Sequence, residues 1–443
     1  MPVKLPPGPR LPRLAQSYKW ARQPTTLMET ARERWGDVWT LRLLGPVTFV
    51  LVADPQLIEA VFAADRTLLH AGEANGIIGE GLLGPNSLLL LDEQPHASKR
   101  GLLQPPFHHA HIERYHDAIA SICEQEIAGW PLGEPLELLP RMQAITLKSI
   151  MSVVFGVTGG PAQERLHARI GEIFAWAANP LHMVSLHLAH RRDSDLPKGF
   201  LAVRDPFDAV LFEEIRKARE DPELERRDDV LAMLAKTRYE DGTPIDDRDL
   251  RDQMVTLLIQ GHQTTAAALA WALERLMRHP AAYERLSAEA DGSGGEYLDA
   301  VFKETLRVRP PLPMIPRAVA NRPYPLGEYE LPVGSMVAPS IYMVQRREEA
   351  YPEPARFRPE RFLEGADDRY TWIAFGGGDR HCLGRSFATA EFKLALRMIV
   401  QRVGLRPVDL EDERIVRRGI LFAPAAGARA IVQERAAQAS PAA

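Results

Sequence analysis

The sequence predicts a mainly α-helical fold with small β-sheets near its N- and C-terminal parts. Helical periodicity dominates from about residue 95 to residue 286, with breaks at Gly and Pro. Strand-like segments lie toward the two ends, at residues 38–52, 323–337 and 418–432. No repeat or long linker divides the chain. We therefore expect one domain over residues 1–435, followed by a disordered Ala-rich tail at 436–443.

The first strand-like segment is expected to form a hairpin. Apolar residues alternate on both sides of Gly45-Pro46, with Trp39 and Leu41 before the turn and Phe49 and Leu51 after it. Alternation with a period of two places these side chains on common faces of two paired strands.

Composition and charge narrow the class of protein. The 443 residues are 45% hydrophobic and 26% charged, which allows a large buried core. The formal net charge is −5 and the basic residues are dispersed, so we expect no nucleic-acid partner. Residues 1–10 contain four prolines and no apolar run, so we expect no membrane anchor. The default expectation is a soluble, cytoplasmic monomer.

One long helix is predicted from about Asp246 to Arg278. Asp246 is a suitable N-cap and Pro280 ends the helix, which would be about 50 Å long. Its centre is apolar nearly all round, as in a helix that crosses the interior of a domain. Residues 260–265 nevertheless read Gln-Gly-His-Gln-Thr-Thr. Polar groups are costly in a buried helix unless they have partners, so this cluster indicates a site.

The chain has two cysteines with very different surroundings. Cys123 lies in an apolar helical pattern and is expected to be a small buried residue. Cys382 lies in the loop 375–384, which contains a run of three glycines and precedes a helical stretch at 385–403. Glycines allow a loop to pass close to a flat ligand, and the helix start, with Arg380 and Arg385, favours a thiolate.

Three interpretations of the cysteine loop remain open on these grounds. A lone thiolate in a glycine loop suits an axial ligand of haem iron. The loop could also be an ordinary one, or Cys382 could be a nucleophile with adjacent His381 as its only evident base. The glycines do not have the spacing of a phosphate-binding loop, and no second ligand stands at zinc spacing.

The loop resembles the haem-binding signature of the cytochrome P450 family, F-x-x-G-x-R-x-C-x-G. Phe375, Gly378, Arg380, Cys382 and Gly384 match every fixed position. The resemblance extends over most of the chain and implies the cytochrome P450 fold. It also implies haem b, bound through the Cys382 thiolate, with the other matching residues lining the cofactor.

Further motifs agree with this resemblance. Glu304 and Arg307 form an E-x-x-R pair on one helix face, and the family pattern adds Arg361 to a structural charge network. The family also implies that His96, Arg100, Arg317 and Arg380 contact the haem propionates. Two carboxylates inside a protein need several cationic donors, so this number is reasonable.

The long helix matches the family's oxygen-activating pattern at Gly261, Thr264 and Thr265. By resemblance, Thr264 hydrogen-bonds dioxygen and helps deliver protons. Gln263 stands where the family has an acid, and an amide cannot supply a proton by ionising. We expect leakier oxygen activation, with protons delivered by water or by His262 if that side chain points inward.

Gln260 also departs from the pattern, because the family has a small residue there. It lies one turn before Thr264 on the same helix face and should look toward the distal side of the haem. There it could contact an iron ligand, coordinate weakly or hold a polar group of the substrate. Alternatively, it turns aside and bonds backbone or water.

Substrate and partner expectations follow from the resemblance. Apolar segments at 77–90, 174–188, 312–315 and 420–422 correspond to substrate-facing regions and suit a terpenoid, steroid, fatty-acyl or polyketide-like molecule. Residues 182–192 could form a lid. Electrons should come from a separate ferredoxin or flavodoxin that docks near Lys99 and Arg385.

Three functions are weighed. The leading one is a monooxygenase that inserts one oxygen atom from O2 into a C–H or C=C bond. The second, motivated by Gln263, is a peroxide-driven peroxygenase or an isomerase. The third is a non-catalytic haem protein that binds a ligand, against which the retained Thr264 argues.

Overall fold

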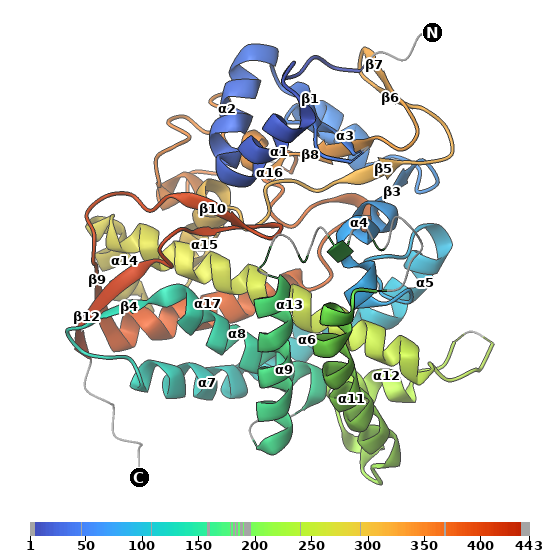
Figure 1. The fold of residues 1–443 in the computed structure, drawn as a ribbon. Helices are drawn as coiled ribbons and strands as arrows, with labels where there is room; N and C mark the ends of the chain where they lie inside the picture. The colour runs from blue at the N-terminus through green and yellow to red at the C-terminus, as the bar shows by residue number, and fades with distance from the viewer. Residues whose placement is uncertain are drawn as a thin grey trace.

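The computed structural model describes residues 5–435, apart from residues 46, 108, 157–159, 178, 180–181, 183–184, 187–188, 190–195, 240, 293 and 367–368. The expected tail at 436–443 and most of the expected lid at 182–192 lie outside these residues. Figure 1 shows the largest sheet and the N-terminal helices on one side of the molecule and most other helices on the opposite side.

Helices dominate the described chain, as predicted. They are α1 (Arg13–Arg22), α2 (Pro24–Trp35), α3 (Pro55–Phe62), α4 (Ala71–Leu83), α5 (Glu93–Leu103), α6 (His109–Ile112), α7 (His116–Ala128), α8 (Leu138–Phe155), α9 (Pro161–Ala177), α11 (Lys198–Glu220), α12 (Val230–Lys236), α13 (Asp247–Met277), α14 (Pro280–Ala290), α15 (Glu296–Val308), α16 (Ile341–Val344) and α17 (Arg385–Arg402). Short 3-10 turns include η4 (Pro359–Phe362) and η5 (Gly378–Arg380).

The strands form small sheets near the two ends of the chain, which confirms the predicted fold class. They are β1 (Val38–Arg42), β2 (Thr48–Val52), β3 (Leu69–His70), β4 (Pro135–Glu137), β5 (Arg317–Val319), β6 (Tyr324–Leu326), β7 (Tyr329–Leu331), β8 (Met336–Pro339), β9 (Val403–Pro407), β10 (Ile415–Arg418), β11 (Leu421–Pro424) and β12 (Arg429–Arg435). The largest sheet has the order β1-β2-β8-β5-β3, and β4-β12-β9 form another.

The predicted hairpin is present as β1 and β2. The strands are antiparallel, with Trp39 opposite Leu51 and Leu41 opposite Phe49. Gly45 in the connection has φ +81°, a left-handed conformation that glycine adopts without strain. β2 also pairs in parallel with β8, so the hairpin is one edge of a sheet that brings together residues nearly 300 positions apart.

The predicted long helix is α13, and its bounds agree with the prediction. The Asp246 carboxylate accepts a hydrogen bond from the Asp249 N–H at 2.8 Å, and Arg278 is the C-cap. Most of its side chains are buried, because α8, α17 and α15 pack around it. In Figure 1 this helix crosses the middle of the molecule.

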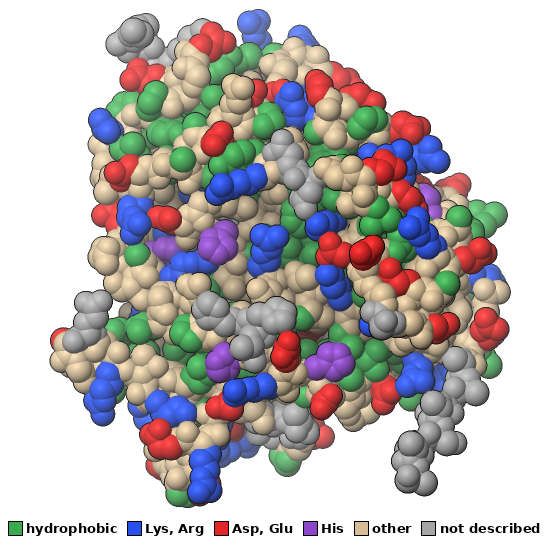
Figure 2. Space-filling view, turned by 180° about the vertical axis from the view of Figure 1, so that it is seen from behind, with side chains coloured by type: hydrophobic (Ala, Val, Ile, Leu, Met, Phe, Trp, Pro, Cys, Tyr) green, Lys and Arg blue, Asp and Glu red, His purple; other side chains and the backbone are tan. Residues whose placement is uncertain are grey.

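The surface shown in Figure 2 mixes the two signs of charge. Lys and Arg side chains are interspersed with Asp and Glu on this face, and the chain carries a formal net charge of −5. This face therefore offers no broad positive surface for a phosphate backbone. Among the described helices, none is sufficiently long and apolar to pass through a membrane.

Candidate active site

The loop before α17 is a compact turn held by its own backbone. The Cys382 N–H donates to the Phe375 carbonyl at 2.9 Å, and the His381 N–H donates to the Gly378 carbonyl at 3.1 Å. Gly384 is the N-cap of α17, and its N–H donates to the Cys382 sulfur. The helix start therefore points a backbone donor at the thiol, as the sequence predicted.

The glycines of this loop serve packing as well as conformation. Gly376 and Gly378 have φ of +72° and +63°. A Cβ at Gly377 would lie 2.3 Å from the Phe62 ring, and one at Gly378 would lie 2.2 Å from the Phe62 carbonyl oxygen. The sequence interpretation, close approach to a ligand, missed that these two glycines let the loop dock on the end of α3.

The Cys382 thiol is exposed but lies among many protein atoms. Burial raises its pKa in the protein alone, while the Gly384 N–H, Arg100 and Arg385 act to lower it. The helix start and Arg385 thus lower the pKa of the thiol as expected. Arg100, rather than Arg380, is the second arginine that does so. Desolvation outweighs them, so the bare thiol holds its proton more tightly than usual.

Buried positive charge gathers beside this loop. Burial lowers the pKa of His96 to about 3, and the nearby Arg380, Arg100 and Arg317 lower it further. Burial likewise lowers the pKa of Arg317 to about 10, with Arg380 adding to the effect. The structure therefore brings together the four residues that the sequence grouped, and the three arginine charges repel one another beside a neutral His96.

The four side chains differ in what they already bind. Arg380 bonds the Asp92 carboxylate and the Leu91 carbonyl, and Arg100 contacts the His381 ring at 2.9 Å. Arg317, 6% exposed, forms no ion pair with a described residue and has one long 3.4 Å contact to the Pro316 carbonyl, although the Asp92 carboxylate is near enough to raise its pKa. A buried guanidinium without an ion pair is costly, so this place fits an anionic ligand.

Most side chains at the centre of α13 are less buried than those on either side of them. Ile259, Gln260, Gly261, Gln263 and Thr264 are half-buried, whereas the residues on either side of this stretch are buried. Partial exposure inside a buried helix shows that this half-buried strip is packed less tightly than the rest of α13.

The backbone at this strip has two local features. The Thr264 hydroxyl donates to the Gln260 carbonyl one turn upstream at 2.8 Å. A Cβ at Gly261 would lie 2.8 Å from Ile150, so α8 approaches α13 closely at this glycine. The helix is thereby fixed on one side, where α8 packs.

His262 and Gln263 turn toward α8. The His262 ring contacts the Thr146 hydroxyl at 3.1 Å, and burial lowers its pKa to about 3. Gln143 donates its amide N–H to the Gln263 side-chain oxygen at 2.8 Å. His262 is therefore a neutral packed side chain at physiological pH, and it does not meet the condition of pointing inward that a proton-delivering role required.

Gln260 shares the helix face of Thr264, as predicted. Its side chain is half-buried and makes no hydrogen bond to any residue that the structure describes. Of the predicted alternative, in which Gln260 turns aside and bonds backbone or water, the described residues show no backbone bond, and the bond to water stays a prediction.

The E-x-x-R network has the predicted structural form. Arg307 donates from Nε and Nη2 to the Glu304 carboxylate at 2.7 and 2.8 Å, and Arg361 Nε donates to it at 3.1 Å. All three side chains are buried. Their remaining donors bond carbonyls of residues 345–356, so the network fixes that segment to α15.

Two expectations about individual residues are wrong. Lys99 is 8% exposed and pairs with Asp249 and the Tyr239 hydroxyl, so it cannot form part of a surface for a redox partner. Phe422 is fully buried and packs edge-on against Tyr342 at 5.8 Å. It belongs to the core rather than to a substrate-facing surface.

The other apolar segments remain consistent with a pocket lining. Leu82, Leu89, Leu90 and residues 312 and 314–315 are apolar and half-buried. Ile315 lies beside the cysteine loop, since a Cβ at Gly376 would be 3.4 Å from it. The side chains at 77–78 and most of 178–188 lie outside the described residues.

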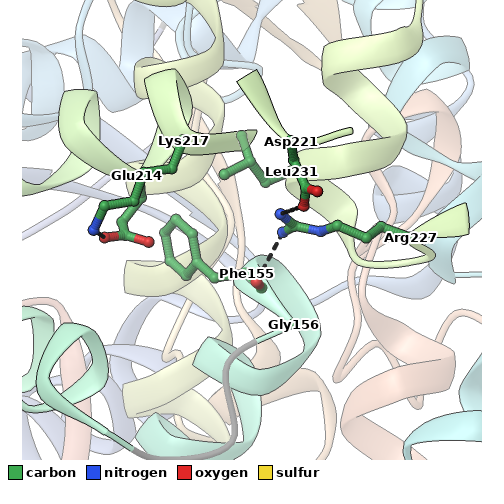
Figure 3. Close-up of a pocket in the computed structure, with 7 residues that line it drawn as sticks. All are labelled: Phe155, Gly156, Glu214, Lys217, Asp221, Arg227 and Leu231. Carbon is green, nitrogen blue, oxygen red and sulfur yellow. Dashed lines mark hydrogen bonds and ion pairs between the residues drawn. The ribbon is translucent and has the colours of Figure 1, made fainter. Parts of the chain in front are cut away.

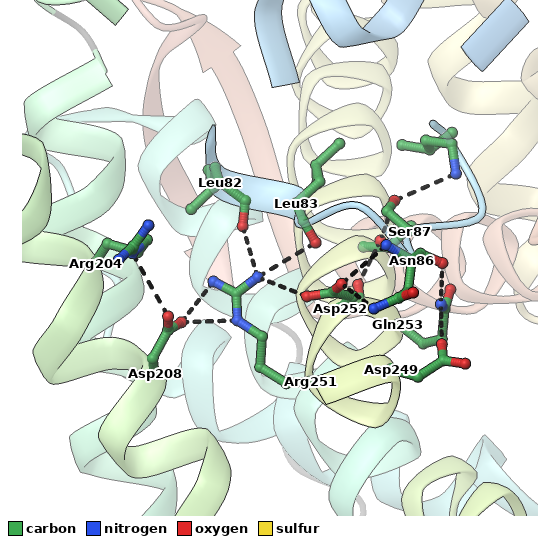
Figure 4. A network of polar contacts seen from close by, with 12 residues as sticks. Leu82, Leu83, Asn86, Ser87, Arg204, Asp208, Asp249, Arg251, Asp252 and Gln253 are labelled. Carbon is green, nitrogen blue, oxygen red and sulfur yellow. Dashed lines mark hydrogen bonds and ion pairs between the residues drawn. The ribbon is translucent and has the colours of Figure 1, made fainter. Parts of the chain in front are cut away.

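A polar network ties the first half of α13 to its neighbours (Figure 4). Arg251 bonds Asp208 on α11, the Leu82 and Leu83 carbonyls, and Asp252. Asp252 accepts from both nitrogens of Asn86 at 3.0 Å. These buried bonds hold the segment after α4 and one face of α11 against α13, and no local sequence pattern indicates them.

A surface pocket of about 250 Å³ lies elsewhere, between α8, α11 and α12 (Figure 3). Its charged side chains are already paired, Lys217 with Glu214 and Arg227 with Asp221. None of the residues predicted to form the site lines it. We regard it as a crevice between packed helices.

The fold and this arrangement define a class: a helical protein whose cysteine loop and adjoining buried cations suit a haem held by a thiolate. The sequence matches the Cytochrome P450 family over residues 5–427. Cytochrome P450 135B1 of Mycobacterium tuberculosis H37Rv is 40% identical over 434 residues, covering 96% of this chain and 90% of that protein.

Two solved structures share the fold. The retinoic acid-bound cyanobacterial CYP120A1 has a TM-score of 0.84 and the P450DA haem domain one of 0.82. Each is 22% identical and covers 98% of this chain, over 100% and 98% of its own length respectively. The chain therefore belongs to the cytochrome P450 family, which makes it a haem-dependent monooxygenase that uses dioxygen, a redox partner and a small-molecule substrate.

Proposed function

We propose that this chain uses haem b, ligated by Cys382, to insert one oxygen atom of dioxygen into an apolar small molecule of terpenoid, steroid, fatty-acyl or polyketide type. The observation that supports the cofactor site most directly is Arg317, a buried cation beside the cysteine loop that forms no ion pair with a described carboxylate. Two propionates would balance this charge, with His96, Arg100 and Arg380 as further partners.

The haem, when bound, supplies the redox chemistry that activates dioxygen. The protein's residues have the remaining tasks. The Gly384 N–H and Arg385 moderate the charge on the Cys382 sulfur. The Arg385 guanidinium lies 5.6 Å from the Phe375 ring centre, which fixes this side chain against the loop. The half-buried strip of α13 presents Thr264 to dioxygen.

Arg317→Leu should make the protein lose haem faster, on the order of tenfold or more, because a charge-assisted bond to a propionate is removed. The measurement is the rate of haem transfer to apomyoglobin. Arg322→Leu is the control, since Arg322 is exposed and five residues away. Equal transfer rates for the two variants would argue against a propionate at Arg317.

Apolar half-buried side chains on both sides of the site support the substrate class. Ile259 on α13, Leu89 after α4 and Ile315 before β5 come from three separate segments. A screen of apolar compounds for a shift of the haem spectrum to the high-spin form identifies ligands. Product formation from such a ligand with NAD(P)H, a ferredoxin and its reductase tests the function, and product without oxygen incorporation would contradict it.

Gln263→Glu should improve the yield of product per electron several-fold and lower peroxide release, because a carboxyl at this position can move protons. The side-chain oxygen would still accept from Gln143, so the change preserves local packing. Peroxide yield per NAD(P)H consumed is the measurement, with Gln143→Glu as the matched control on α8. An unchanged peroxide yield in Gln263→Glu would show that residue 263 does not limit proton delivery.

Gln260 is assigned a binding role on the same strip. Its amide has no hydrogen bond to a described residue and lies on the face of Thr264. We assign it to a polar group of the substrate or to a ligand of the iron. Gln260→Ala separates the two: an altered resting spectrum without substrate indicates the iron ligand, and weaker substrate binding with an unchanged resting spectrum indicates the substrate.

A peroxide-driven reaction is the second candidate, and one observation favours it. On the described turn around Thr264, the two side chains that could take the place of the missing acid, His262 and Gln263, are both held toward α8. Hydrogen peroxide would need less proton delivery by the protein. Turnover with peroxide alone that exceeds turnover with the ferredoxin system would favour this candidate.

The redox partner is proposed to be an acidic ferredoxin or flavodoxin. Arg385 is exposed and Arg100 half-exposed on the cysteine side, whereas Lys99 is buried. Electrostatic steering toward this modest positive surface would make the reduction rate fall as ionic strength rises.

A further inference from the structure

One buried acid, Glu391, has no part in the proposed function. Glu391 lies on α17, nine positions after Cys382, and is fully buried beside Phe392 and Phe387. Neither carboxyl oxygen completes a hydrogen bond of ordinary geometry in the described part of the chain. An unpartnered carboxyl at such a place costs free energy and calls for an explanation.

Three helices meet at this carboxyl. Ser149 on α8 and Thr265 on α13 place hydroxyl groups near enough to act on its pKa. The Cys123 thiol on α7 is also close, because Glu391 contributes to raising the Cys123 pKa to about 12, after the larger effect of burial. Cys123 is the titratable neighbour, and no charged side chain is among the causes of the Glu391 shift.

Burial raises the pKa of Glu391 from 4.5 to about 8, against the opposing effect of the two hydroxyls. The carboxyl therefore carries its proton at neutral pH. A neutral carboxylic acid has one donor and one acceptor, so it can bind two hydroxyl groups on different helices after a small rotation.

Thr265 directly follows Thr264, and this turn has lost the family's acid at position 263. We propose that Glu391, as a neutral carboxylic acid, is a positioning residue that holds the Thr264–Thr265 turn of α13 through the Thr265 hydroxyl. This inference rests on the proposed function, because it assigns that turn to dioxygen. It gives the turn a fixed anchor on α17, the helix that begins at the cysteine loop.

The anchor should fail in alkaline solution. The pKa of Glu391 is higher in the folded protein, about 8, than its ordinary value of 4.5. The neutral carboxyl therefore contributes its full stabilisation of the folded state below pH 4.5. This contribution is lost as the pH rises to about 8. Above that pH the folded protein holds a buried carboxylate that no cation of the described residues pairs with. Water should then enter beside Thr265 and loosen the turn.

The test compares the purified haem protein with Glu391→Gln, Glu391→Leu and the exposed control Glu284→Gln. The first readout is the infrared carbonyl band of a protonated carboxylic acid, which should titrate near pH 8 and be missing only from the two Glu391 variants. The second is the rate at which the dithionite-reduced protein reoxidises in air, which requires no substrate.

We expect the wild type and Glu284→Gln to reoxidise several-fold faster above pH 8 than at pH 7. Glu391→Gln, which keeps a donor and an acceptor but cannot ionise, should be slow at both pH values, and Glu391→Leu should be fast at both. An alkaline rise that persists in Glu391→Gln, or a wild type without the protonated-acid band, would overturn the proposal.

Two controls keep the outcome interpretable. If Glu391→Gln does not fold, Thr265→Val replaces it and should be fast at both pH values, and a wild-type profile there would also overturn the proposal. An intact carbon-monoxide band in every variant separates a failure of this inference from a failure of the proposed haem ligation.

Discussion

Replacing Arg307 by alanine should lower the free energy of unfolding by about 3–5 kcal/mol. The guanidinium donates two hydrogen bonds to Glu304, and both side chains are fully buried. Without it, Arg361 is the one cation among the described residues that still pairs with this fully buried carboxylate. The backbone carbonyls of residues 345 and 354 would also lose their donor, and that of residue 356 would keep only its 3.4 Å bond from Arg361.

Urea unfolding of the haem-loaded variants measures this effect, with Arg216→Ala as the matched control. Arg216 pairs with Glu220 at 3.0 Å on the exposed side of α11, where an ion pair contributes about 0–1 kcal/mol. If Arg307→Ala were no less stable than Arg216→Ala, the buried network would not hold the segment 345–356 in place.

The hairpin, the long helix α13 and the cysteine loop were predictable from the sequence, because each depends on residues within one segment. The hairpin around Gly45 follows from alternation, and α13 follows from its N-cap at Asp246, its apolar run and Pro280. The cysteine loop was recognised because its ten residues are contiguous. In each case the information lies within one segment, so no knowledge of distant partners is needed.

Side-chain directions on α13 could not be predicted in the same way. His262 and Gln263 point to Thr146 and Gln143, which lie about 120 positions earlier in the sequence. Helical spacing says that residues 260 and 264 share a face, but not which neighbour packs against 262 or 263. The question of whether His262 points inward was therefore decided only by the position of α8.

The burial of Lys99 is a second feature that local sequence spacing could not predict. A lysine between His96 and Arg100 was expected to be exposed, but Asp249 and Tyr239, 150 and 140 positions away, bury it. A weak signal did exist for Glu391, since one acid on the apolar face of a predicted helix is uncommon. Only the meeting of α7, α8, α13 and α17 shows that it is without a cation.

Cys382→Ser should abolish the haem-thiolate spectrum. Serine keeps the backbone bond to Phe375, and its hydroxyl oxygen can accept from the Gly384 N–H in place of the sulfur, but this hydroxyl does not ionise near neutral pH. Without the thiolate, the iron would lose its axial ligand from the protein. We expect most of the haem to be lost on purification, and the remainder to have the spectrum of an ordinary haem protein. Cys123→Ala, which removes the other cysteine, should keep the full spectrum because Cys123 is buried on α7.

The most direct measurement is therefore the carbon-monoxide difference spectrum of the three reduced, purified proteins. We predict that the wild type and Cys123→Ala show the carbon-monoxide band characteristic of cytochrome P450 proteins. Cys382→Ser should show no such band. A band that survives in Cys382→Ser, or a wild type that loads haem but never shows the band, would contradict the central claim that the Cys382 sulfur binds the iron.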